Sequence, residues 1–266
     1  MTSLPVNPEV RGRPSLIGLI AIGLGAGFLS GLFGVGGGLV IVPALVALAA
    51  MPRKLASGTS LVAIIPTATV GVIGYAALGN VDVLVALILA GGSVVGAQAG
   101  SWLLHRLPVK VVRWAFMGFM LLAAASLFIT VPSREASFVA NPVSIAGLVV
   151  LGLVTGVMSG LLGVGGGLVV VPVLIVVFGV SDLLTKGSSL LMMIPTAISG
   201  TVGNLKRGNA DVRSGLTVGG AACLTSAAGA WVSQHLDPKV ANIAFAVFIL
   251  AVFAQMVLQS RTRRDV

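Results

Sequence analysis

The chain has 266 residues, of which 57% are hydrophobic and only 9% are charged, and its formal net charge is +9. Soluble domains carry about 25% charged residues, so this composition excludes a soluble globular fold and predicts a polytopic membrane protein. The basic residues lie between apolar runs, where they act as orientation signals and do not indicate nucleic-acid binding. The one cysteine, Cys223, excludes an intramolecular disulfide and a cysteine-based metal site.

Runs without charged residues or histidine predict the membrane segments. A helix crosses the hydrocarbon core with about 20 residues. Two runs, 14–52 and 136–181, are too long for one helix, and a glycine-rich turn interrupts each of them. The other runs predict about one crossing each; they are 55–81, 83–104, 114–133, 187–205, 214–234 and 240–260.

The first glycine-rich turn lies in the sequence SGLFGVGGGLVIVPAL, from Ser30 to Leu45. Four glycines in five residues cannot hold an ordinary helix, so the turn divides its run into helices over roughly 15–31 and 38–50. The second of these, about 20 Å long, is too short to cross a membrane alone. The pair is therefore a re-entrant hairpin or two short crossings, and both arrangements return the chain to its starting side.

The second half of the chain repeats the first at a constant shift of 129 residues. Ser159 to Leu174 reads SGLLGVGGGLVVVPVL, which differs from the first copy at three positions. The repeat predicts two structural halves, 15–131 and 143–259, a linker at 132–142, and termini at 1–14 and 260–266. The same shift aligns Gly58-Thr59-Ser60-Leu61 with Gly187-Ser188-Ser189-Leu190, Ile65-Pro66-Thr67 with Ile194-Pro195-Thr196, and Gly79-Asn80-Val81-Asp82 with Gly208-Asn209-Ala210-Asp211.

The positions of Lys and Arg predict the orientation of the two halves. If each glycine-broken run returns to its own side, one face holds 13 basic residues and the other holds 3. If each run crosses once, the split is 7 against 9, which is close to random. The positive-inside rule therefore predicts cytoplasmic termini and a second half inverted relative to the first. The predicted fold is all-α, with two inverted-topology repeats that each contain a glycine-broken pair of half-helices plus three transmembrane helices.

The two glycine turns are the first candidate binding site. The N-terminus of a half-helix offers unpaired N–H groups and about half a positive charge, and glycine lets a ligand approach the backbone closely. Two such turns at one site predict binding of a small anion; the alternative is that the glycines serve only tight turns or close helix packing. The candidate residues are Gly34, Val35, Gly36, Gly37 and Gly38, with Gly163, Val164, Gly165, Gly166 and Gly167.

Hydroxyl side chains form a second candidate set. Thr67 and Thr196 follow prolines, which free a backbone carbonyl and can unwind a helix, so these threonines could line the same site. The alternative is that each threonine satisfies a nearby carbonyl of its own helix. The remaining members stand near the start of apolar helices, where the alternative is N-capping; they are Thr59, Ser60, Ser188 and Ser189.

The repeated Gly-Asn-x-Asp sequence predicts a tight turn in which Asp82 or Asp211 caps the next helix; the alternative is a proton-carrying or gating carboxylate.

No acidic or basic residue lies deep in a membrane run, which disfavours a cation substrate and leaves no buried carboxylate for proton coupling. His105 and His235 lie in loops and cannot form a metal site with the ligands at hand. We therefore expect no metal, no cofactor, no catalytic residues and no enzymatic activity.

The duplicated GxGGGxxxxP sequences, Gly34 to Pro43 and Gly163 to Pro172, resemble the TauE/SafE sulfite-exporter family. The preceding S-G-L, the later G-T/S-S-L and the P-T of the next helix belong to the same resemblance, which covers essentially the whole chain. It implies a multi-pass permease of the bacterial inner membrane, linked to sulfite or organic sulfonates such as sulfoacetate. These motifs specify the family well and its substrate poorly.

We therefore expect a secondary transporter that holds a small anion between the glycine turns and alternates access as the halves rock. The alternatives are an anion channel and a non-transporting membrane scaffold or accessory subunit. The expected partners are the anionic substrate and the lipid bilayer, with no nucleic acid. The sequence leaves open whether the protein forms a homo-oligomer, which ion is coupled, in which direction transport runs, and whether the broken pairs re-enter or cross.

Overall fold

The structure is a computed structural model that describes residues 15–103, 109–129, 138 and 140–261. These residues form ten α-helices and no strand, which confirms the predicted all-α class. The first half contains α1 (Leu16–Phe33), α2 (Gly38–Leu48), α3 (Arg53–Ala76), α4 (Val83–Leu103) and α5 (Val109–Ile129). The second half contains α6 (Pro142–Leu162), α7 (Gly167–Val176), α8 (Asp182–Leu205), α9 (Val212–His235) and α10 (Pro238–Arg261).

Each half opens with a long helix and a short one, separated by a glycine turn. Helices α1 and α6 end at Gly34 and Gly163, which adopt left-handed conformations with φ of 70° and 71°. Their N–H groups donate to the carbonyl oxygens of Ser30 and Ser159, which closes each helix in the way typical of a C-terminal glycine. The short helices α2 and α7 then run for only 11 and 10 residues.

Several helices have the length and composition of membrane spans. Six of those in the described part of the chain are long and apolar enough to cross a bilayer: α1, α3, α4, α6, α9 and the stretch Pro238–Leu258 of α10. Helices α2 and α7 are apolar but shorter, as is the stretch Phe116–Phe128 within α5. This arrangement is that of a multi-pass membrane protein.

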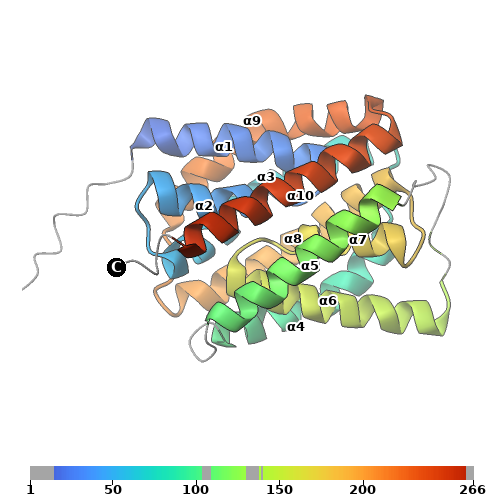
Figure 1. Ribbon diagram of the computed structural model, residues 1–266, viewed down its shortest axis with the longest axis horizontal. Coiled ribbons are helices and arrows are strands. Elements are labelled where there is room, and N and C mark those ends of the chain that lie inside the picture. Colours follow the sequence, from blue (N-terminus) through green and yellow to red (C-terminus); the bar gives the residue numbers. More distant parts are fainter. Residues whose placement is uncertain (1–14, 104–108, 130–137, 139, 262–266) are drawn as a thin grey trace, which may run out of the picture.

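The first helices of the two halves, α1 and α6, run in opposite directions (Figure 1). Helix α1 begins and α10 ends at the same end of the molecule, whereas α6 begins at the opposite end. Helix α2 turns back toward the end at which α1 begins. The position of each half relative to the cytoplasm, and the boundaries of the halves, stay predictions. The termini at 1–14 and 262–266 and most of the linker lie outside the described residues.

Glycines bring the helices of the two halves into backbone contact. On α4, Gly92, Gly96 and Gly100 face α6, where a methyl group would overlap carbonyl oxygens of Val149, Leu153 and Val157 respectively. Glycines 152, 156 and 160 of α6 face α4 in the same way, and glycines 23, 27 and 31 make the equivalent contact of α1 with α9. Inside a membrane, close packing of small residues is a principal source of helix association.

Two neighbouring glycines of α4 test this packing. Replacing Gly92 by Ala should destabilise the protein by about 1–3 kcal/mol, because the methyl group would overlap Val149 of α6. Gly91→Ala is the matched control: no atom lies within 4 Å of its methyl position, so stability should stay the same or rise slightly. Thermal unfolding in detergent measures both effects, and equal melting temperatures would contradict the proposed packing.

Candidate functional site

The two glycine turns, Gly34–Gly38 and Gly163–Gly167, meet at the centre of the structure. A methyl group on Gly38 would lie 2.5 Å from the carbonyl oxygen of Gly163. In the equivalent contact, a methyl group on Gly167 would lie 2.6 Å from the carbonyl oxygen of Gly34. The turns therefore pack backbone against backbone, and any side chain at these two positions would separate them.

The backbone of each turn places the start of a half-helix at this contact. Gly36 and Gly37 have φ of 71° and 74°, and Gly165 and Gly166 have φ of 81° and 94°, a region that favours glycine. Gly37 and Gly166 are the N-caps of α2 and α7, and neither helix has a side-chain cap. The N–H groups that open α2 and α7 thus lie where the halves meet, with no side-chain oxygen occupying them.

Two of the candidate serines hold the glycine turn of the opposite half. The Ser60 hydroxyl on α3 donates to the carbonyl oxygen of Gly163, and the Ser189 hydroxyl on α8 donates to that of Gly34, each at 2.5 Å. Both serines are fully buried. Their hydroxyls therefore tie the two halves together at the turns, in place of capping their own helices.

Thr59 and Ser188 bind a different part of the opposite half. Thr59 Oγ1 accepts from the backbone N–H of Asp211 at 3.0 Å, and Ser188 Oγ accepts from that of Asp82 at 2.8 Å. The adjacent Gly58 and Gly187 allow this approach, since a methyl group on either would overlap a carbonyl oxygen of the facing Gly-Asn-x-Asp turn. Each Gly-Asn-x-Asp turn is thus clamped by the helix start of the other half.

The aspartates of these turns cap the next helices, which confirms the preferred interpretation of the motif. Asp82 Oδ1 accepts from the N–H of Val85 at 3.1 Å. Asp211 is the N-cap of α9, where its Oδ1 accepts from the N–H groups of Arg213 and Ser214.

The two threonines that follow prolines satisfy carbonyls of their own helices. Thr67 donates to the carbonyl oxygen of Ala63, and Thr196 to that of Met192, each at 2.8 Å. Helices α3 and α8 continue through their prolines, so neither is unwound there. The Thr196 hydroxyl also makes a short contact with Ser93 of α4. Local carbonyl satisfaction is therefore what these hydroxyls do in this conformation.

Ile64 and Met193 lie between the glycine turns, and neither was expected there from the sequence. They are equivalent under the 129-residue shift and are fully buried. A methyl group on Gly36 would overlap Met193 Cε and lie 3.4 Å from Ile64 Cγ2, and a methyl group on Gly165 would meet the same two side chains. Apolar side chains thus cover the glycine turns here. One apolar residue in an apolar run carries no signal that would have singled it out.

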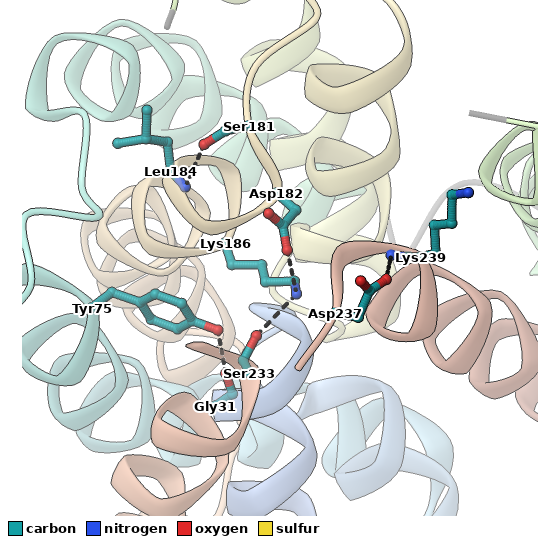
Figure 2. A network of polar contacts seen from close by, with 9 residues as sticks. All are labelled: Gly31, Tyr75, Ser181, Asp182, Leu184, Lys186, Ser233, Asp237 and Lys239. Atoms are coloured by element: carbon teal, nitrogen blue, oxygen red, sulfur yellow. Dashed lines mark hydrogen bonds and ion pairs between the residues drawn. The ribbon is translucent and has the colours of Figure 1, made fainter. Parts of the chain in front are cut away.

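A buried ion pair on α8 corrects the expectation that no carboxylate is buried (Figure 2). Asp182 and Lys186 are 0% and 1% exposed, and Lys186 Nζ lies 3.4 Å from Asp182 Oδ2. Both residues were expected in a loop, because the predicted membrane run begins at residue 187. Helix α8 in fact begins at Asp182, after the N-cap Ser181, whose hydroxyl accepts from the N–H of Leu184. The Ser-Asp pair was the signal that could have shown this.

The described residues contain no group of three or more histidine, cysteine or acidic side chains that could hold a metal ion. The groups assembled at the centre are backbone N–H and C=O groups, hydroxyls, two apolar side chains and, beside the first turn, one buried ion pair.

Known proteins provide an independent comparison. The family model described as "Sulfite exporter TauE/SafE" matches residues 3–127 and 148–265. The chain is similar to YunE of Bacillus subtilis, at 24% identity over 92% of this chain and 98% of that protein, and to YdhB of the same organism, at 27% over 70% and 77%. A protein of Haemophilus influenzae is 27% identical over 90% of this chain and 97% of its own. All three are named probable membrane transporter proteins, and no solved structure matches.

The serine contacts between the halves can be tested by substitution. Ser60→Ala and Ser189→Ala should each lower stability by about 0.5–2 kcal/mol, because each leaves a buried carbonyl oxygen without its donor. Ser126→Ala is the matched control, since that hydroxyl bonds only within its own helix, to Ala123. Melting temperatures in detergent measure the effect. Equal values for all three variants would show that these contacts contribute nothing.

Proposed function

Because the chain belongs to the sulfite exporter TauE/SafE family of membrane transporters, we propose that it is a secondary transporter of a small anion bound between its two glycine turns. The proposed substrate is sulfite or an organosulfonate such as sulfoacetate. We place the protein in the inner membrane with both termini cytoplasmic, in keeping with the distribution of basic residues.

One observation carries the proposal: α2 and α7 both begin at the contact of the two turns, and neither has a side-chain cap. Each helix start supplies N–H donors and a partial positive charge. An oxyanion carries several acceptor oxygens, so donors from two helix starts can hold it from two sides. Backbone donors bind such an ion without a permanent charge on the residues of the turns themselves.

In the proposed transport cycle, Ile64 and Met193 block the binding site. Their side chains lie against the glycines that would receive the anion. We assign the structure to a closed state in which these side chains fill the space between the turns. Rocking of the halves would withdraw them and expose the N–H groups to one side at a time.

Transport by the purified protein in liposomes tests the proposal. We expect saturable uptake of labelled sulfite or sulfoacetate, and a melting temperature that rises with the concentration of the bound anion. Uptake that does not saturate, together with single-channel currents, would instead identify an anion channel. A protein that moves and binds neither anion would be a scaffold or an accessory subunit, and the proposal would be wrong.

Substitutions at the two N-caps locate the binding site. Gly37→Val and Gly166→Val should reduce transport by about 10- to 100-fold or more, because each displaces N–H donors to a charged ligand. Both positions have positive φ, so valine also strains the backbone. Gly79→Val is the matched control: Gly79 has φ of 72° and no atom within 4 Å of its methyl position. Equal transport by all three variants would remove the site from the glycine turns.

A further inference from the structure

The buried ion pair of α8 joins three helices next to the first glycine turn. Lys186 Nζ donates to Ser233 Oγ of α9 at 2.9 Å as well as to Asp182 (Figure 2). Tyr75 of α3 lies beside the same serine and donates its hydroxyl to the carbonyl oxygen of Gly31 at 2.8 Å. A full ion pair is expensive to bury, so its position calls for a reason beyond stability.

Lys186 lies directly against the first glycine turn. A methyl group on Gly34 would lie 2.7 Å from Cα, 2.8 Å from Cβ and 3.0 Å from Cγ of Lys186. The Ser189 hydroxyl bonds both the Lys186 carbonyl oxygen and that of Gly34, which fixes the backbone of α8 to the turn. The stem of Lys186 thus packs on the turn, while its ammonium group lies at the end of a flexible chain between Asp182 and Ser233.

The second glycine turn has no such charge. Under the 129-residue shift, Ser57 occupies the position of Lys186, and it packs against Gly163 as Lys186 packs against Gly34. Arg53 occupies the position of Asp182. Both halves therefore have a residue packed against the opposite glycine turn, Ser57 in the first and Lys186 in the second. Only the second half places a buried lysine and its carboxylate there.

The carboxylate of Asp182 is only partly satisfied. Its Oδ2 faces Lys186 at 3.4 Å, and its Oδ1 has no hydrogen-bond partner among the described residues, although the side chain is fully buried. Tyr75 and Ser233 face the pair from other helices. Asp237 and Lys239, at the start of α10, lie nearby on the exposed surface, where Asp237 accepts from the Lys239 N–H. Lys186 is therefore the one buried cation that faces Asp182 from the described helices.

We propose that Lys186 is the anion-binding cation of the first glycine turn and that Asp182 is its internal counter-anion, so that anion and proton bind together. The incoming anion takes the place of the Asp182 carboxylate beside the ammonium group. A proton from water on the open side adds to Asp182, and on release of the anion the proton leaves and the ion pair re-forms. One proton balances the buried charge for a singly charged anion. For a doubly charged anion such as sulfoacetate, the partial positive charges of the two helix starts, about half a charge each, offset the second negative charge. No redox step or further co-reactant is needed.

This inference rests on the proposed function, because it concerns the same anion at the same turn. It assigns the coupling ion, which the family match leaves open. Binding of the anion and binding of the proton favour one another, and linkage makes that coupling reciprocal. Anion affinity should therefore rise as the pH falls, and anion binding should draw a proton from solution.

Binding of sulfoacetate to the purified full-length protein tests the coupling, because that anion keeps its charge between about pH 6 and about pH 8. In the wild type the dissociation constant should fall as pH is lowered, by up to about tenfold per unit for a coupling of one proton. Asp182→Asn should bind at both pH values with no pH response and no proton uptake. Asp237→Asn, the control carboxylate, should keep the wild-type response.

The variant Asp182→Asn/Lys186→Gln removes both charges, so it folds without an unpaired buried ion, and a melting curve checks this. It should bind sulfoacetate at least about tenfold more weakly than Asp182→Asn at either pH. Equal binding by these two variants, or a pH response that survives in Asp182→Asn, would overturn the inference while the proposed function stands. A wild type that binds neither sulfite nor sulfoacetate would overturn both.

Discussion

The contact between two glycine turns is the constraint on which the structure depends. Gly38 approaches the carbonyl oxygen of Gly163, and Gly167 approaches that of Gly34, at distances that leave no room for a side chain. This contact requires that α1 and α6 stop where they do and that α2 and α7 start there. It also brings two carbonyl oxygens within reach of Ser60 and Ser189, so the hydroxyl of each half satisfies the turn of the other.

Close contacts between glycines and backbone carbonyl oxygens also occur away from the centre. Helix pairs α1–α9 and α4–α6 meet through glycines that face carbonyl oxygens, and each Gly-Asn-x-Asp turn lies against a glycine of the opposite half. In a bilayer the tails are as apolar as leucine, so helices gain little from burying leucine against one another. Close backbone contacts and hydrogen bonds between the two halves hold the helices together instead. Many of the described glycines serve one of these needs, since they allow either the turns or the close approaches.

The repeat and the glycine turns were readable in the sequence because both are patterns of residue type at a fixed spacing. The described helices follow the predicted runs closely; α4, for example, spans Val83–Leu103 against a predicted 83–104. Helices α5 and α8 differ most, since each begins five residues before its predicted run. The prediction assumed that charged residues end a membrane segment, whereas Asp182 and Lys186 of α8 pair inside the protein. Ile64 and Met193 were not predictable, since their role depends on which face of α3 and α8 meets the turns. The hydroxyl partners depend in the same way on contacts between halves far apart in sequence.

In the proposed transport cycle, the difference between the halves explains how a nearly symmetric scaffold could bind an anion and release it again. Backbone donors from α2 and α7 treat the two sides of the centre alike, so by themselves they favour neither loading nor release. A permanently unpaired lysine would bind an anion tightly but would be costly to bury when the site is empty. Lys186 avoids this cost because Asp182 neutralises it in the empty state. In this proposal a proton can neutralise Asp182, so anion loading depends on the pH of the solution that the open side faces. A site built from two identical halves without a carboxylate would lack this dependence.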